Sequence, residues 1–438
     1  MSVMTRGIFV LVMILGLCAH AQDSSVRITS SGANADTRTP IAVPPFATAD
    51  PALKEIASEL AEVLAYDLEF SGLFNLLPAS QYPPDFQGLD ADVSKLDLNS
   101  WRGTKAENLV YGLIMADGED LVAQFRLFDL FSKEQLVGQE LRVKRTFPRL
   151  AAHRFSEEVV RFIDGTPGVG TTEICFSVGE TGNKEIYVSD YDGANIKQVT
   201  KHNSISIKPK FSPDGNRIAY LSYKDRYMFI YVYDRATGKS VPVSKEVGLN
   251  SAPTWSPDGN TLALTLSKDG NTEIYLRNAD GTNPRRLTNN RFGDTSPTFS
   301  PDGSRIAYVS EQGGNPQIYV MGADGSGTKR LSFQGGSAYD PVWSPDGAMI
   351  AYIAEKPGDG LELYVMNADG TNPRRLTDTQ GSNESPSWSP DSRNVVIMST
   401  RDGSAHVYMV NVENPLTQRR VPNLNMRCEG PFWGPRRR

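Results

Sequence analysis

The sequence predicts a two-domain protein with a small N-terminal α/β domain followed by an all-β six-bladed propeller, which is closed by the C-terminal strand. Three observations lead to this prediction. An aromatic-Ser-Pro-Asp-Gly motif, or a near copy of it, recurs at a fixed spacing in the second half of the chain. The residues before about position 165 lack this repeat. The first and last repeat units are both incomplete, and the strands they lack are complementary.

The repeat is clearest at Trp255-Ser256-Pro257-Asp258-Gly259. Its aromatic residue recurs at positions 211, 255, 299, 343, 388 and 433, so the steps are 44, 44, 44, 45 and 45 residues. A period of roughly 40 to 45 residues with several strands in each unit is typical of propeller blades. Ser, Pro and Asp suit the first three positions of a type I turn, and Gly supplies a positive φ at the fourth. We therefore predict a hairpin turn at each copy.

Each repeat also contains four short strand signals in the same order. In the clearest unit, strand A ends at 252–255, strand B covers 262–264 and strand C covers 274–276. After the turn Asp280-Gly281, strand D carries Leu287-Thr288. The same pattern returns one period earlier and later, so the predicted unit is a four-stranded antiparallel blade.

The ends of the repeat array predict a closed ring. One period before Ile218 lies Ile174-Cys175-Phe176, which gives the first blade a strand B, but no motif precedes it to supply strand A. At the other end, Pro431-Phe432-Trp433 forms a strand A with no later strands. We expect this C-terminal strand to complete the first blade, because closure removes the exposed edges of an open array.

The first 21 residues have the pattern of a secretory signal peptide. Arg6 is followed by an apolar run over 8–17 and by Ala19-His20-Ala21, a small-x-small cleavage pattern. The mature chain should begin at Gln22. No later segment approaches the roughly 20 apolar residues needed to cross a bilayer, so we expect a soluble exported protein.

Residues 22–165 are predicted to form the α/β domain, with a mobile N-terminal arm, and residues 166–438 the propeller. A strand over 41–46 precedes a helix capped by Asp50, with Pro51 in its first position, and Gly72 ends that helix. Further strands are predicted over 74–77, 109–115, 121–128 and 136–145. A second helix begins at Pro148 and is expected to bury Ala151, Phe155, Val159 and Phe162. Residues 165–170 are rich in Gly and are predicted to form a hinge or linker.

Composition excludes several classes of protein. The net charge of −6 argues against a nucleic-acid partner. Only Cys175 and Cys428 remain after signal removal, so disulfides do not organise the fold. If the closing strand pairs like the other A strands, Cys428 lies several residues away from the partner of Cys175, too far for a disulfide. We therefore predict free thiols.

The main alternative to a binding protein is an exported propeller enzyme related to peptidases or lyases. No Gly-x-Ser-x-Gly motif is present, and no hydrolase domain fits after Trp433. The histidines of the mature chain, His153, His202 and His406, are scattered, so we predict neither a catalytic site nor a metal site. The recurrent aspartates of the repeats are interpreted as turn formers, because they lack the spacing of a calcium loop. No cofactor is predicted, and a purely structural scaffold remains a third alternative.

Pro40-Ile41-Ala42-Val43-Pro44-Pro45-Phe46 and the segment from Tyr66 to Phe74, followed by the propeller repeats, resemble the TolB family of periplasmic Tol-Pal components. The resemblance covers nearly the whole mature chain. It implies a non-enzymatic adaptor that binds the peptidoglycan-associated lipoprotein Pal and the inner-membrane protein TolA. In this role the adaptor supports outer-membrane integrity and constriction during cell division, as a monomer in hetero-complexes that could include other outer-membrane proteins. Departures such as Ser392 in place of the repeat Gly affect turns and leave the architecture intact.

The candidate partner surface is the mouth of the central channel, defined as the loops leading from strand D of one blade to strand A of the next. These loops differ from blade to blade, whereas the Ser-Pro-Asp-Gly turns on the opposite face, called the turn face, are nearly identical. Loops on a rigid scaffold often carry binding residues, although these loops could also vary simply because nothing constrains them. The predicted Pal contacts are Leu249, Asn250, Phe292, Asp294, Thr295, Tyr339, Asp340 and Glu384. For TolA, the resemblance points to the N-terminal arm, at Val26, Arg27, Ile28 and Gly32.

Overall fold

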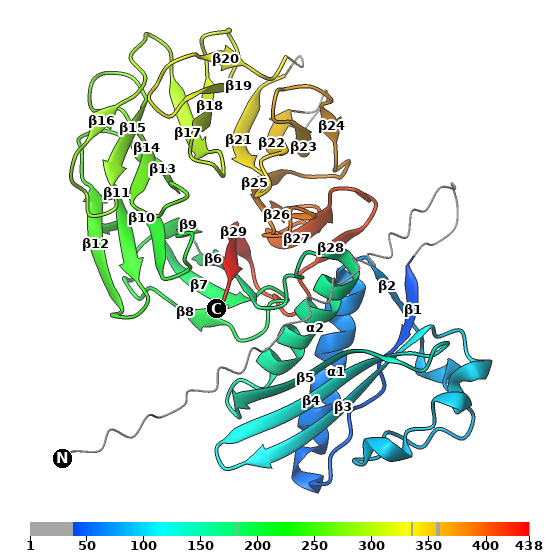
Figure 1. Ribbon diagram of the computed structural model, residues 1–438. Helices are drawn as coiled ribbons and strands as arrows, with labels where there is room; N and C mark the ends of the chain where they lie inside the picture. The colour runs from blue at the N-terminus through cyan, green and yellow to red at the C-terminus, as the bar shows by residue number, and fades with distance from the viewer. Residues whose placement is uncertain (1–37, 181, 334–335, 356–359, 438) are drawn as a thin grey trace, which may run out of the picture. The chain divides into compact units, whose positions relative to one another are not determined.

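The computed structural model describes residues 38–180, 182–333, 336–355 and 360–437, and Figure 1 shows its course. Within these residues the chain forms an α/β domain with one five-stranded sheet, followed by a ring of six four-stranded sheets. The predicted fold class is thus confirmed. The signal peptide and the N-terminal arm lie outside the described residues. No described helix is long and apolar enough to cross a membrane.

The α/β domain is built on a mixed sheet in the order β2-β1-β3-β4-β5. β1 pairs in parallel with β2 and β3, and β3, β4 and β5 form an antiparallel meander. Its strands are β1 (Thr39–Ala42), β2 (Phe74–Leu76), β3 (Asn108–Asp117), β4 (Asp120–Asp129) and β5 (Gln135–Lys144). Its helices are α1 (Lys54–Phe70) and α2 (Arg149–Asp164), with short 3-10 helices η1 (Pro51–Leu53), η2 (Ala79–Gln81), η3 (Val93–Lys95) and η4 (Leu98–Gly103).

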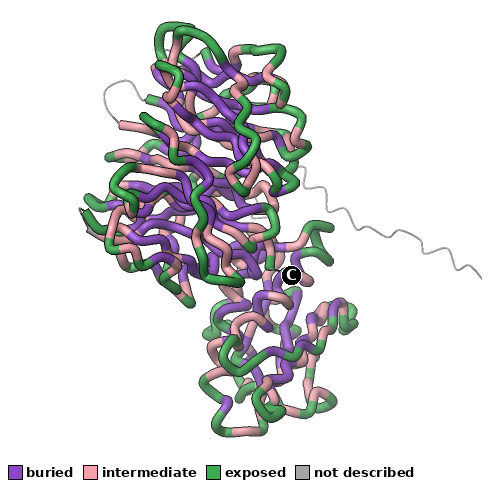
Figure 2. Tube along the Cα trace, turned by 90° about the vertical axis from the view of Figure 1, so that its left-hand side faces the viewer, coloured by how far each residue is buried: buried purple, intermediate pink, exposed green. Residues whose placement is uncertain are grey.

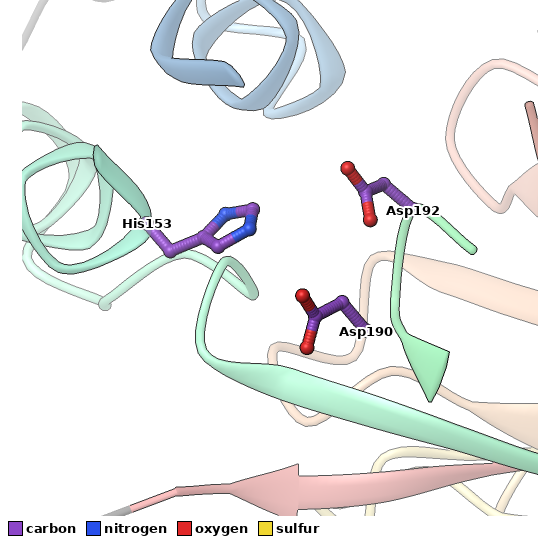
Figure 3. Close-up of side chains that lie close together, drawn as sticks. All are labelled: His153, Asp190 and Asp192. Carbon is purple, nitrogen blue, oxygen red and sulfur yellow. The ribbon is translucent and has the colours of Figure 1, made fainter. Parts of the chain in front are cut away.

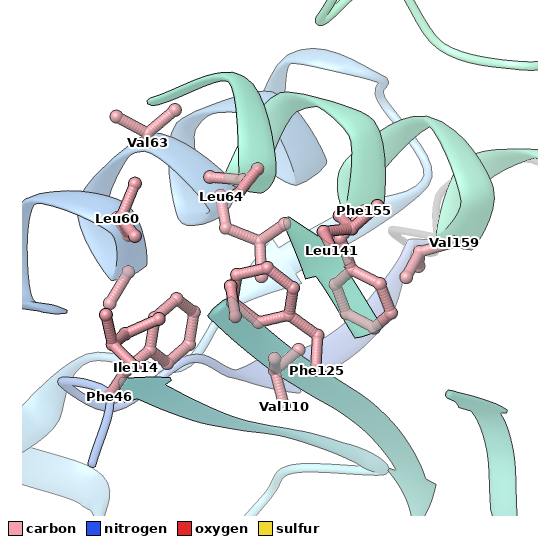
Figure 4. Packing of buried hydrophobic residues seen from close by; sticks show 14 of the residues in the cluster. Phe46, Leu60, Val63, Leu64, Val110, Ile114, Phe125, Leu141, Phe155 and Val159 are labelled. Carbon is pink, nitrogen blue, oxygen red and sulfur yellow. The ribbon is translucent and has the colours of Figure 1, made fainter. Parts of the chain in front are cut away.

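Both helices pack on one face of this sheet. Figure 4 shows Leu64 of α1 and Phe155 of α2 next to Phe125 of β4, and Leu60 of α1 next to Phe46, in this core. Side chains alternate along a strand, so the opposite face buries a different set of residues, among them Trp101. The second face is therefore covered over β1 and the start of β3, whereas Glu140 and Arg142 of β5 are exposed.

The start of the first helix follows the prediction, but one residue of the second does not. The Asp50 side chain accepts the N–H of Ala52 at 2.9 Å and caps η1, which continues into α1. On α2, Ala151, Phe155 and Val159 are buried as predicted, but Phe162 is 52% exposed. Phe162 lies in the last turn of the helix, beyond the sheet. The prediction for Phe162 was wrong because the apolar pattern continues past the end of the packed face.

The propeller repeats one blade six times within the described residues, and each sheet has the order A-B-C-D. The A strands are β29 (Cys428–Arg436), β9 (Ser206–Phe211), β13 (Asn250–Trp255), β17 (Asp294–Phe299), β21 (Ala338–Trp343) and β25 (Asn383–Trp388). The B strands are β6 (Thr172–Glu180), β10 (Arg217–Asp225), β14 (Thr261–Leu266), β18 (Arg305–Ser310), β22 (Met349–Glu355) and β26 (Asn394–Ser399). The C strands are β7 (Asn183–Asp190), β11 (Tyr227–Asp234), β15 (Glu273–Asn278), β19 (Gln317–Gly322), β23 (Leu361–Asn367) and β27 (His406–Asn411). The D strands are β8 (Lys197–Gln198), β12 (Lys239–Ser244), β16 (Arg285–Arg286), β20 (Lys329–Arg330), β24 (Arg374–Arg375) and β28 (Gln418–Arg420). Figure 2 shows buried strands and exposed loops.

Most D strands end before the residues predicted for them. Strand D was placed at Leu287-Thr288, whereas β16 ends at Arg286. Beyond β16, Leu287 still donates its N–H to the Ile274 carbonyl at 2.8 Å, and the Thr288 hydroxyl accepts the N–H of Ile274 at 2.9 Å, so a backbone bond and a side-chain bond continue the contact with strand C. The same hydroxyl bond recurs in three other blades, at Thr200, Ser332 and Thr377.

The C-terminal strand closes the ring as predicted. β29 pairs antiparallel with β6, and Trp433 lies opposite Ile174, as Trp255 lies opposite Leu262. Cys175 pairs with Phe432 and Cys428 with Val178, so the two cysteines are out of register. Both are buried free thiols.

The segment predicted as a hinge, 165–170, is packed against both domains. Val169 is buried, and a side chain on Gly170 would lie within 3 Å of the carbonyl oxygen of His153 and of the Asp67 carboxylate. Residues Thr39–Arg438 form one compact unit. The segment therefore acts as a docked connection and not as a free hinge.

The repeated turns are stabilised by their Ser and Asp side chains. In the third repeat, the Ser300 hydroxyl and the N–H and hydroxyl of Ser304 donate to the Asp302 carboxylate. At the position of the repeat Gly, Ser392 adopts φ 60°, close to the 69° of Gly259, so the departing copy keeps the same turn. The interpretation of these aspartates as turn formers agrees with the geometry.

We predict an acid-sensitive contribution from these turns. Hydrogen bonds from Ser300 and Ser304 lower the pKa of Asp302 from 3.8 to about 2. Because the folded-state pKa is the lower one, the stabilisation is present above about pH 4 and is lost as the pH falls towards 2. The gap in melting temperature between wild type and Asp302→Asn should therefore narrow over this range in calorimetry. A gap that stays constant from pH 6 to pH 2 would contradict this assignment.

Candidate protein-binding surface

Each A strand has a bulge where it lines the central channel. The residue before a proline has a positive φ in every blade: 51° at Lys208, 47° at Ala252, 52° at Ser296, 46° at Asp340, 54° at Ser385 and 58° at Gly430. The pairing register with strand B shifts around this point. Proline has no N–H for the ladder, which favours a bulge here. Five different residue types occupy the six equivalent positions, with serine at both 296 and 385, so the channel lining is asymmetric.

The channel carries charges of both signs. The Ser296 hydroxyl donates to the Asp340 carboxylate at 3.0 Å and thereby links neighbouring blades. Enclosure within the channel lowers the pKa of Lys210 to about 8. Burial, together with the negative charge of Asp340, raises the pKa of Glu384. A cleft of about 580 Å³ next to the channel is lined in part by Lys184, Glu384 and Arg427.

Two of the eight residues predicted to contact Pal have a structural role instead. Asn250 and Asp294 are both fully buried. The Asn250 amide accepts from the Ser244 hydroxyl and donates to the carbonyl of Glu246, and Asp294 accepts from Asn290 at 2.7 Å. Both occupy the first position of an A strand and tie down the preceding loop. The repeat period places them at equivalent positions, and this could have revealed their shared structural role.

The other six predicted contacts, Leu249, Phe292, Thr295, Tyr339, Asp340 and Glu384, are exposed or half-buried. Sequence reasoning missed three exposed apolar residues on the same side of the blades: Val247 (87% exposed), Phe333 (71%) and Tyr227 (70%). Val247 and Phe333 lie in loops between strands D and A, and Tyr227 begins β11 after the B–C turn. The sequence feature that could have revealed these three residues is an apolar side chain within an otherwise polar loop. Together with Leu249, Phe292 and Tyr339 they define what we call the mouth patch.

The α/β domain contacts the turn face, on the side of the propeller opposite the mouth. Asp164 at the end of α2 forms an ion pair with Arg393, which follows the sixth-blade turn. Arg149 of α2 forms an ion pair with Asp192 in the C–D turn of the first blade. Figure 3 shows Asp192 in this turn, close to His153 of α2. These contacts involve the turn face of two blades and leave the mouth patch on the other side.

Comparison with known proteins identifies both domains. Residues 25–136 match the TolB amino-terminal domain, and residues 160–360 match the TolB beta propeller domain. The chain belongs to the TolB family. A crystal structure of TolB from Acinetobacter baumannii is similar over 91% of this chain and 97% of that one, with a TM-score of 0.80 at 26% identity. The family resemblance found in the sequence is thereby confirmed.

Curated relatives of the TolB family match over a shorter span. The Tol-Pal system protein TolB of Syntrophotalea carbinolica is 37% identical over 219 residues, which is 49% of this chain and 50% of that protein. The protein of the same name from Geobacter sulfurreducens is 37% identical over 201 residues, 45% of each chain. The matched region thus spans about half the length of these relatives.

The three histidines that were considered as possible ligands lie in different environments. His202 stacks on Tyr220, and its Nδ1 lies 3.2 Å from the Ser206 hydroxyl. Nε2 of His406 lies 2.8 Å from the Ser404 hydroxyl. His153 is buried between α2 and the first blade, as expected for a packed histidine, but it lies beside two aspartates from the propeller.

Proposed function

We propose that this TolB-family chain is a periplasmic adaptor of the Tol-Pal system, which binds Pal at the mouth patch and TolA through its N-terminal arm. In this role it supports outer-membrane integrity and constriction during cell division. The observation that carries the proposal is the combination of both TolB domains in one chain. The asymmetric mouth patch supports it by offering a surface for a single partner.

The mouth patch has the composition expected of a protein interface. Aromatic residues and arginine are enriched at such interfaces and often provide the largest share of the binding energy. The Arg291 guanidinium lies 5.0 Å from the ring centre of Phe292, and the Tyr339 hydroxyl donates to Glu355 at 3.3 Å. These contacts hold two half-buried rings in place, so less conformational entropy is lost when a partner binds.

The double variant Phe292→Ala/Tyr339→Ala is expected to weaken binding of the Pal periplasmic domain by about 2 kcal/mol or more, roughly 30-fold in Kd, because it removes two aromatic anchors. Isothermal titration calorimetry would measure this. The matched controls are Asn260→Ala and Ser304→Ala, two exposed residues on the turn face, and they should change Kd little. If the turn-face variants abolish binding while the mouth variant binds normally, the faces have been assigned the wrong way round.

The TolA contact is proposed for Val26 to Gly32, which lie outside the described residues. Deleting residues 22–33 from the mature chain should remove TolA binding and leave Pal binding intact. Normal TolA binding after this deletion would contradict the proposed role of the arm.

Affinity purification of the mature chain from envelope extract separates the adaptor from the two alternative classes, an enzyme and a purely structural scaffold. An adaptor should retrieve a lipoprotein in stoichiometric amount. An exported propeller enzyme should retrieve no stable partner, and neither should a purely structural scaffold. We propose a non-enzymatic role because the adaptor class agrees best with the family and with the exposed mouth patch.

A further inference from the structure

Three potential metal ligands from two distant parts of the sequence meet at the junction of α2 and the first blade. His153 projects from α2, Asp190 is the last residue of β7, and Asp192 lies in the turn that follows. One ligand atom from each residue lies within 4.8 Å of the others, and all three residues are buried. Figure 3 shows the imidazole and the two carboxylates directed towards a common point.

The second observation is an imidazole nitrogen without a partner. His153 is 1% exposed, and among the described residues nothing forms a hydrogen bond with its Nε2. A buried polar atom without a hydrogen-bond partner lowers the stability of the folded chain, and such atoms often mark a ligand or functional site. Figure 3 shows the ring nitrogen farther from the backbone, Nε2, on the side of Asp190 and Asp192, so an ion held by the two carboxylates would give this nitrogen a partner.

The other imidazole nitrogen has the partner that metal-bound histidines commonly use. Nδ1 of His153 lies 2.8 Å from Oδ2 of Asp67. Asp67 also accepts the hydroxyls of Ser156 and Tyr191, each at 2.6 Å, so it is an acceptor fixed in place on both of its oxygens. A carboxylate on one nitrogen orients the ring and directs the lone pair of the other nitrogen to a metal.

The two aspartates keep capacity for a cation although they already have partners. Asp190 accepts from Arg437 and Asn195, each at 2.6 Å, and Asp192 accepts from Arg149 and from the N–H of Ala194. A carboxylate offers about four lone-pair positions, so each retains room for a further ligand bond.

The charge of the surrounding ion-pair network also favours a bound cation. The groups in this network are Asp67, Asp190, Asp192, Glu59 and Glu173 with Arg149, Arg235 and Arg437. Asp67, Asp190 and Asp192 are deeply buried, and Arg149 is the only guanidinium among these groups that is mostly buried, because Arg235 and Arg437 are partly exposed. Buried negative charge needs compensation, and a bound cation supplies it.

We propose that His153, Asp190 and Asp192 bind a divalent transition-metal ion, with Zn²⁺ the best match, which links the α/β domain to the first blade. One imidazole and two carboxylates form a donor set that Zn²⁺ accepts, whereas Ca²⁺ and Mg²⁺ prefer oxygen ligands alone. Because the ligands come from both domains, the ion stabilises the docked arrangement and binds the folded chain only.

The test uses the untagged mature chain, stripped with a chelator and dialysed. Titration with ZnCl₂ at pH 7.5 should give one bound Zn²⁺ per chain by elemental analysis and a rise in melting temperature of several degrees. Parallel titrations with MnCl₂ and CaCl₂ test selectivity, and Ca²⁺ should bind at least about tenfold more weakly than Zn²⁺.

The variants His153→Gln and Asp192→Asn should each lose the bound Zn²⁺ and the thermal shift. His202→Gln is the matched control and should retain both, because His202 lies in the second blade near Ser206. Circular dichroism shows whether each variant folds. If a variant does not fold, the number of Zn²⁺ ions bound per wild-type chain still tests the proposed site. Wild type without stoichiometric Zn²⁺ at about 10 μM free metal would overturn the site, as would unchanged binding by folded His153→Gln. In either case His153 would be a protonated imidazolium that compensates the aspartates without a metal.

Discussion

Removal of Pro431 to Arg438 from the mature chain is expected to lower its melting temperature by at least about 6 °C. The deletion removes most of β29 and exposes the free edge of β6 in the first blade. Trp433 is buried, stacks on Tyr191, and donates its indole N–H to the Thr172 hydroxyl at 2.8 Å. Loss of a buried tryptophan alone costs about 3 to 5 kcal/mol, and each kcal/mol shifts the melting temperature by about 2 to 4 °C for domains of this size.

Differential scanning calorimetry measures this effect. The control is Leu416→Ser, which replaces a side chain that is 95% exposed in the last blade and should change the melting temperature little. A truncated chain that melts at the wild-type temperature would show that this strand does not close the ring.

Asp67→Ala is expected to destabilise the folded chain by about 3 to 5 kcal/mol, the range for breaking a buried charged network. Asp67 on α1 accepts hydrogen bonds from Tyr191 of the propeller and from Ser156 of α2, and its Oδ2 lies next to Nδ1 of His153. Removing the carboxylate leaves these buried groups without their acceptor. The change in the free energy of unfolding is measured by urea denaturation.

Asp85→Ala is the matched control, because Asp85 is an exposed aspartate in the same domain. It should lower the free energy of unfolding by less than about 0.5 kcal/mol. If Asp67→Ala proved as mild as this control, Asp67 would not be the residue that joins the two domains.

Sequence periodicity was sufficient to predict the propeller because every blade obeys the same turn chemistry. The step from Trp255 to Trp433 located the closing strand, and the register of that strand correctly separated Cys175 from Cys428. Periodicity was less informative at the ends of the D strands. β16 ends at Arg286, although Leu287 and the Thr288 hydroxyl still hydrogen-bond to Ile274 of strand C.

The candidate surfaces were only partly predictable. Variation between the mouth loops favoured this face, but it could not separate half-buried Phe292 from fully buried Asp294, because burial depends on how each loop folds over its own blade. The cluster of His153 with Asp190 and Asp192 was not foreseen. Its members lie on a helix of one domain and a turn of the other, and no periodicity of either element brings them together.

Titration of the purified periplasmic domain of Pal into the wild-type mature chain is the most direct test of the proposed function. We predict saturable one-to-one binding with a Kd of about 1 μM or tighter, equivalent to about −8 kcal/mol. The Phe292→Ala/Tyr339→Ala variant should shift this Kd by roughly 30-fold under the same conditions. The absence of binding by the folded wild-type chain at about 100 μM, equivalent to less than about 5.5 kcal/mol of affinity, would contradict the assignment of this chain as a Pal-binding adaptor.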